Sequence, residues 1–76
     1  MDRSNSIDDI AVRCKAARDN LVQTAERLAV TEDRAADLFD DLAARRPDRA
    51  EPIGHLAERA RAGARRAREI ADHFSR

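Results

Sequence analysis

The chain is poor in the residues that staple or interrupt small proteins. It has one cysteine, two glycines and two prolines, and no tryptophan or tyrosine. A single cysteine excludes an internal disulfide and a zinc site built from several thiolates. No apolar run is longer than three residues, so we expect no membrane-spanning segment and no signal-peptide core. These absences predict a cytoplasmic protein that makes no membrane contact.

Neither sign of charge is in excess, and large apolar residues are scarce. Lys and Arg number 15, as do Asp and Glu, so the formal net charge is zero. Only 14 of the 76 residues are Leu, Ile, Val or Phe, whereas 16 are alanine, which predicts long helices with a thin core. We expect a single helical domain over residues 1–76. A lone core of this size seldom supplies more than about 3–5 kcal/mol, so self-association is expected to add stability.

The first predicted helix spans about residues 6–46, a stretch without glycine or proline. Its apolar residues recur every seven residues, which is typical of helices that pack along their lengths. Thr31 followed by two acidic residues also resembles a helix start, so a break near residues 30–31, giving a three-helix bundle, is an alternative. The two rows of the repeat are Ile7, Cys14, Leu21, Leu28, Ala35 and Leu42, and Ile10, Ala17, Thr24, Thr31 and Leu38.

A second helix is predicted over about residues 52–75, after the interruption at Pro47 and Pro52. Its first turn would be capped either by Asp48 or by Glu51. A short link makes the two helices antiparallel neighbours, with facing residue numbers that sum to about 98. The residues predicted to pack between the helices are Leu28, Leu38, Leu42, Ile53, Leu56, Gly63, Ile70 and Phe74.

The two predicted helices differ in length, about 60 Å against about 36 Å. The second would cover the first only back to about Val22. An apolar stripe then stays uncovered, which usually marks an interface. We therefore predict a homodimer, most simply a four-helix bundle or coiled-coil-like assembly, with another helical protein as a further candidate partner. The predicted self-association residues are Ile7, Ile10, Cys14, Ala17 and Leu21.

Charge is divided between the two halves, with net −4 over residues 1–44 and net +4 over residues 45–76. Arg61, Arg65 and Arg68 share one outward side of the second helix and are candidate phosphate contacts. Acids on the same helix are alternative partners for them, such as Asp72 for Arg68. The zero net charge and the lack of a helix-turn-helix pattern disfavour nucleic-acid binding, which is kept as the alternative function.

Catalytic and metal chemistry find little support in the residues. Glu51 with His55 and Glu69 with His73 have the wrong spacing for the carboxylate-bridged metal bundles, which also need glutamates from other helices. Cys14 has no histidine near it in sequence, and its simplest role is that of a small buried side chain. No glycine-rich phosphate loop or nucleophile elbow is present. We expect no enzyme activity, no cofactor and no metal.

Three segments, Thr31–Ala35, Leu42–Glu51 and Leu56–Arg61, resemble small helical proteins of high-GC actinobacteria that are rich in alanine and arginine. The resemblance covers about half of the chain. It implies a helical fold in a bacterial cytoplasm and transfers no activity, cofactor or site residue. The sequence therefore predicts a non-catalytic helical interaction or self-assembly protein built on an antiparallel hairpin.

Overall fold

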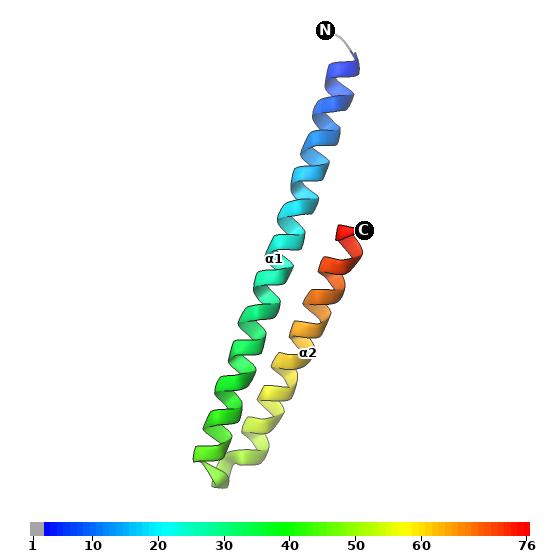
Figure 1. Ribbon diagram of the computed structural model, residues 1–76. Coiled ribbons are helices and arrows are strands. Elements are labelled where there is room, and N and C mark those ends of the chain that lie inside the picture. The colour runs from blue at the N-terminus through cyan, green and yellow to red at the C-terminus, as the bar shows by residue number, and fades with distance from the viewer. Residues whose placement is uncertain (1–2) are drawn as a thin grey trace.

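The computed structural model describes residues 3–76, and their side chains from residue 6 onward. Helix α1 runs from Arg3 to Arg45, a single 3-10 turn (η1) spans Pro47–Arg49, and helix α2 runs from Ala50 to Ser75. The two helices lie side by side and antiparallel, as Figure 1 shows, in a rod of 69 × 15 × 13 Å. The predicted all-α helical hairpin is confirmed over the described residues.

Helix α1 passes through Thr31 without interruption. The alternative of a turn near residues 30–31, with three helices, is therefore wrong. Acidic residues after a threonine are common at helix starts, but they are equally compatible with a helix interior when no glycine or proline intervenes. The long rod of α1 is the element that sets the length of the molecule.

The link between the helices is held by backbone hydrogen bonds. The N–H of Arg46 donates to the carbonyl of Leu42, and the N–H of Arg49 donates to that of Arg46, each at 2.9 Å. The N–H of Ala50 donates to the carbonyl of Pro47. Helix α2 therefore begins at Ala50, without a side-chain cap. The predicted caps Asp48 and Glu51 are therefore wrong. The first N–H of α2 bonds to the carbonyl of Pro47 instead, because η1 leads straight into α2.

The contact between α1 and α2 is built from alanine. All buried residues in the described part of the chain are alanines, and they line the facing sides of the two helices. Side chains this small let two helix backbones approach closely. They are Ala25, Ala29 and Ala36 on α1, and Ala57, Ala60, Ala64, Ala67 and Ala71 on α2.

The predicted packing residues are largely on the outside of the hairpin. Ile53 and Gly63 are half-buried, but the other six are 39–69% exposed. The buried row on α1 lies one residue after the predicted row, so that Ala29 faces α2 in place of Leu28, and Ala36 is buried while Ala35 packs half-buried beside it. On α2 the alanines 57, 64 and 71, which flank the predicted seam, are the buried ones. The exposed six are Leu28, Leu38, Leu42, Leu56, Ile70 and Phe74.

Helix α2 covers only part of α1. Every residue from Ser6 to Leu21 is exposed, and Val22 is the first half-buried residue of α1. The blue end of α1 in Figure 1 accordingly extends well past the C-terminus of α2. We call residues 3–21 the N-terminal arm. Its extent agrees with the helix lengths predicted from the sequence.

Candidate self-association surface

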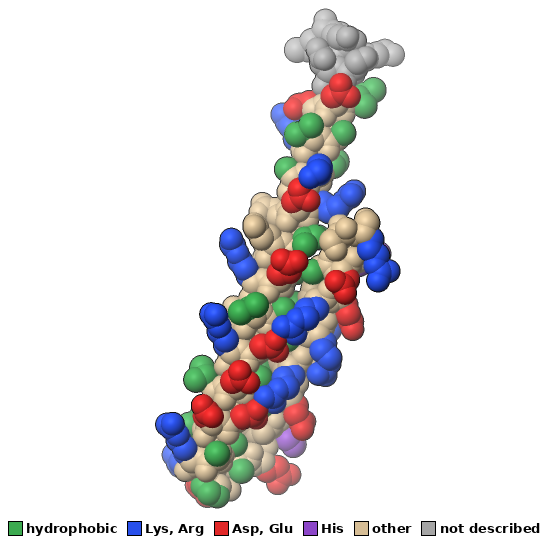
Figure 2. Space-filling model, in the orientation of Figure 1, with side chains coloured by type: hydrophobic (Ala, Val, Ile, Leu, Met, Phe, Trp, Pro, Cys, Tyr) green, Lys and Arg blue, Asp and Glu red, His purple; other side chains and the backbone are tan. Residues whose placement is uncertain are grey.

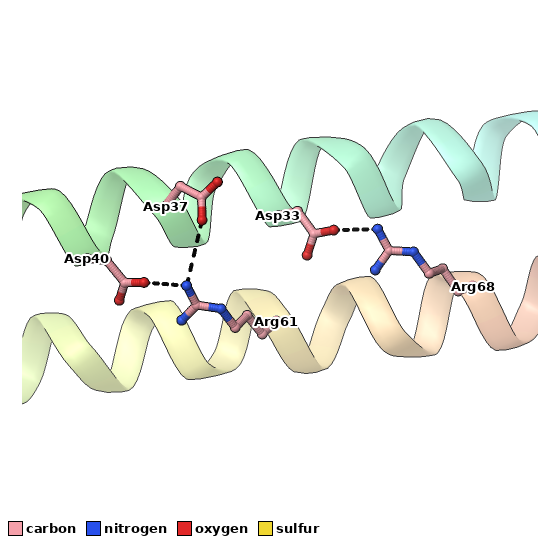
Figure 3. Close-up of polar contacts among 5 residues, drawn as sticks. All are labelled: Asp33, Asp37, Asp40, Arg61 and Arg68. Carbon is pink, nitrogen blue, oxygen red and sulfur yellow. Dashed lines mark hydrogen bonds and ion pairs between the residues drawn. The ribbon is translucent and has the colours of Figure 1, made fainter.

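One edge of the hairpin is held together by ion pairs between the helices. Arg61 of α2 donates a hydrogen bond to Asp40 of α1 and lies 3.7 Å from the carboxylate of Asp37. Arg68 donates to Asp33 about two turns further along the pair of helices. Figure 3 shows both guanidinium groups pointing across to α1. We call the edge defined by Asp33, Asp40, Arg61 and Arg68 the charged edge.

These pairs are partly exposed, with side-chain accessibilities between 40% and 52% for the hydrogen-bonded partners. The hydrogen bond from Arg61 lowers the pKa of Asp40 below its usual value of 3.8, against a smaller opposing effect of desolvation. The same hydrogen bond raises the pKa of Arg61. Exposed pairs of this kind contribute little to stability, typically about 0–1 kcal/mol each.

The sequence interpretation assigned other partners to these side chains. It gave Asp72, on the same helix, as an alternative partner for Arg68. The structure instead brings the acidic and basic halves of the chain together along the line between the helices, as Figure 2 shows. The residue numbers of both hydrogen-bonded pairs sum to 101, and those of the buried alanines that cluster across the helices sum to 93–96, so the predicted sum of 98 is an approximate register.

The edge of the hairpin opposite the ion pairs is apolar. The positions of the ion pairs show which residues lie on it. Asp33 and Asp40 each follow an inward-facing position of α1, and Arg61 and Arg68 each follow a buried alanine of α2. Residues that precede the inward-facing positions on both helices must then meet on the other edge. We call this the apolar edge. It consists of Leu21, Leu28, Ala35 and Leu42 on α1 and Leu56, Gly63 and Ile70 on α2.

The apolar edge exposes the side chains with the most to gain from burial. Leu28 is 49% exposed, Leu42 47% and Ile70 45%. Fully burying such a side chain contributes about 1.5–3 kcal/mol, whereas one methyl or methylene group contributes about 0.8 kcal/mol. The contact between the helices thus leaves almost half of each of these side chains uncovered. Large apolar side chains exposed in one row are the pattern of an interaction site.

The apolar edge continues along the arm. Ile7 is 66% exposed, Ile10 60% and Leu21 41%, and Cys14 and Ala17 are exposed as well. We call the five predicted self-association residues (Ile7, Ile10, Cys14, Ala17 and Leu21) the N-terminal stripe. Because Leu21 belongs to both, the stripe and the apolar edge form one uninterrupted surface. The sequence interpretation separated them into an intermolecular and an intramolecular set.

The remaining candidate sites are dispersed over the molecule. Arg65 is exposed, between the two arginines that are paired with α1. His73 contacts the neighbouring ring of Phe74 edge-on, with 4.9 Å between ring centroids. Among the described residues, no three metal-ligating side chains gather at one point. No helix in that part of the chain is long and apolar enough to cross a membrane.

One hollow lies where α2 ends against α1. It is shallow and open, and both charged and apolar side chains line it, among them Arg18, Val22 and Phe74. Such a surface does not enclose a small molecule, since ligand pockets bury most of their ligand. The apolar surface is therefore the strongest candidate for a functional site.

Comparison with protein-family models, curated proteins and solved structures finds no match to this chain.

Proposed function

We propose that this protein is a non-catalytic self-assembly module whose first partner is a second copy of itself. The proposal is supported by a single observation. All buried residues of the described chain are alanines, while its leucines and isoleucines are exposed, apart from the half-buried Ile53, and most of them lie on one continuous surface. Association buries the apolar area that such a chain still exposes and so stabilises it.

A nucleic-acid role is disfavoured by the charged edge. Phosphate binding needs free cationic side chains on one face. Two of the three candidate arginines, Arg61 and Arg68, are engaged by aspartates of α1. Their positive charge is offset where a phosphate would have to bind, and only Arg65 of the set lacks an ion pair within the described residues.

The test is the mass in solution of the unmodified chain and of one double variant, measured by light scattering after size exclusion. The unmodified chain is expected at twice its mass of 8.5 kDa. Replacing Ile10 and Leu21 with aspartate is expected to give the monomer mass, because each carboxylate would be buried without a partner. If the unmodified chain has the monomer mass even at high concentration, the proposal is wrong.

Val12 offers a matched control on the arm. It is 65% exposed, as much as Ile7, but it lies on the opposite side of α1 from the stripe. Val12→Asp therefore adds one such negative charge to the same helix without entering the proposed interface, and its matched partner is Ile10→Asp alone. We expect Val12→Asp to leave the mass unchanged. Loss of the dimer in this variant would mean that charge on the arm, rather than the stripe, disrupts assembly.

A further inference from the structure

The arm and the apolar edge have matching lengths. The arm spans residues 3–21, or about 28 Å, and the part of α1 that α2 covers spans residues 22–45, or about 36 Å. An arm that lies along the apolar edge of another chain would cover most of it. Two chains that do this to one another must have their α1 helices antiparallel.

The side-chain sizes on α1 follow a pattern that reads the same in both directions. The row from residue 7 to residue 42 has large residues at its ends, small ones at Cys14 and Ala35, and large ones at Leu21 and Leu28. Residue numbers paired across the midpoint, between 24 and 25, sum to 49. In an antiparallel pair, Ile7 then meets Leu42, Cys14 meets Ala35, and Leu21 meets Leu28. Each level contains side chains of similar size, as a symmetric interface requires.

The second helix follows the same pattern. Leu56, Gly63 and Ile70 lie at about the levels of Leu42, Ala35 and Leu28, because facing residue numbers sum to about 98. The apolar edge therefore has large side chains at both ends and small residues, Ala35 and Gly63, at its middle. The arm has the matching profile, with its small residues Cys14 and Ala17 at the middle. An arm placed on this edge can approach most closely where both surfaces are small.

Charge favours the same arrangement. The arm has four basic and three acidic residues, net +1, whereas residues 22–45 have three basic and six acidic, net −3. A parallel pair would place the two acidic segments together. One carboxylate also reaches the apolar edge: a Cβ atom built on Gly63 would lie 3.1 Å from the Oε2 atom of Glu32. The antiparallel register brings Arg18 of the second chain to the level of this carboxylate.

We propose that two copies pair antiparallel, so that the N-terminal arm of each lies along the apolar edge of the other. This inference rests on the proposed self-assembly function and specifies its geometry. Seven large apolar side chains per chain lie on this surface, and Leu38 and Phe74 lie next to it, beside Leu42 and Ile70. All nine are 39–69% exposed: Ile7, Ile10, Leu21, Leu28, Leu38, Leu42, Leu56, Ile70 and Phe74. At roughly 90 Å² each they supply about 800 Å², the contribution of one partner to an interface of standard size.

The single cysteine allows a direct test on the unmodified chain. A spin label on Cys14 of each copy would be separated by 21 residues of helix in the antiparallel pair, or about 30 Å. In a parallel pair the two labels would be neighbours, within about 15 Å allowing for the helix separation. A distance near 30 Å between labels is expected in a double electron–electron resonance measurement. A short distance would overturn the antiparallel arrangement and leave self-assembly intact, whereas a monomer would overturn both.

Oxidative cross-linking provides a second measurement. Cys14 alone is expected to give no linked dimer, but Ala35→Cys should give one, because residues 14 and 35 of different chains meet. Within one chain these positions are about 31 Å apart on a straight helix, so a link between them can only join two chains. The control combines Ala35→Cys with Cys14→Ser and should give no link. A linked dimer of the unmodified chain, or none in Ala35→Cys, would contradict the proposal.

Discussion

At the scale of single residues, the two glycines of α2 have different surroundings. A Cβ atom added to Gly54 meets nothing within 4 Å, whereas one added to Gly63 lies 3.1 Å from the carboxylate of Glu32. Glycine inside a helix is unfavourable relative to alanine by roughly 0.5–1 kcal/mol. The absence of a side chain at Gly63 leaves space for the Glu32 side chain of α1.

We predict that Gly54→Ala raises the free energy of unfolding by about 0.5–1 kcal/mol, because it improves helix propensity without a new contact. Gly63→Ala should give a smaller gain or a loss, since Glu32 must move aside. Urea denaturation followed by circular dichroism measures both variants. Equal gains would show that the Glu32 side chain yields without cost and that Gly63 has no steric role.

At the scale of the helices, the sequence predicted their number, their approximate bounds and the extent of the arm. It could not assign the contact between them. Each helix has two adjacent rows of residues with the same seven-residue spacing. One row contains the large apolar residues, such as Leu28 and Leu56, and the other consists mainly of alanine. Hydrophobicity ranks Leu28 above Ala29, so the larger residue was placed inside. The structure uses the smaller one, because close approach of two helices is decided by size and not by hydrophobicity alone.

The alanine contact predicts a strong sensitivity to size. Ala64 is fully buried against α1, and we expect Ala64→Leu to destabilise the hairpin by about 1–3 kcal/mol by forcing the helices apart. Ala44 is exposed on α1, so Ala44→Leu should change stability by less than about 0.5 kcal/mol. Thermal unfolding of the two variants at one protein concentration compares them. A stable Ala64→Leu variant would contradict a tight alanine contact.

At the scale of the whole molecule, stability depends on how many chains fold together. The hairpin is a thin rod, 69 Å long and 13–15 Å across its short axes, and it has no layer deep enough to bury a leucine completely. Most of its large apolar side chains become covered only if a second chain lies against it. Folding and assembly are then linked, as in dimers that lack a stable folded monomer.

This linkage predicts a melting temperature that depends on protein concentration. Each tenfold increase should raise it by about 2–4 °C, because association stabilises only the folded chain. The variant with aspartate at positions 10 and 21 should have a lower melting temperature, and that temperature should not change over the same range of protein concentration. Melting of the unmodified chain that does not shift with concentration would show that the hairpin is stable alone.

The two edges of the hairpin also determine how far assembly can proceed. Asp33, Asp40, Arg61 and Arg68 occupy the edge opposite the apolar one and satisfy one another within a single chain. A rod that was adhesive on both edges could add copies side by side without end and would form open arrays. If the apolar edge is the self-association surface that we propose, the internally neutralised edge would leave each chain one adhesive side, and two copies would close on one another without further growth. The ion pairs, which contribute little to folding, would then limit the assembly to two chains.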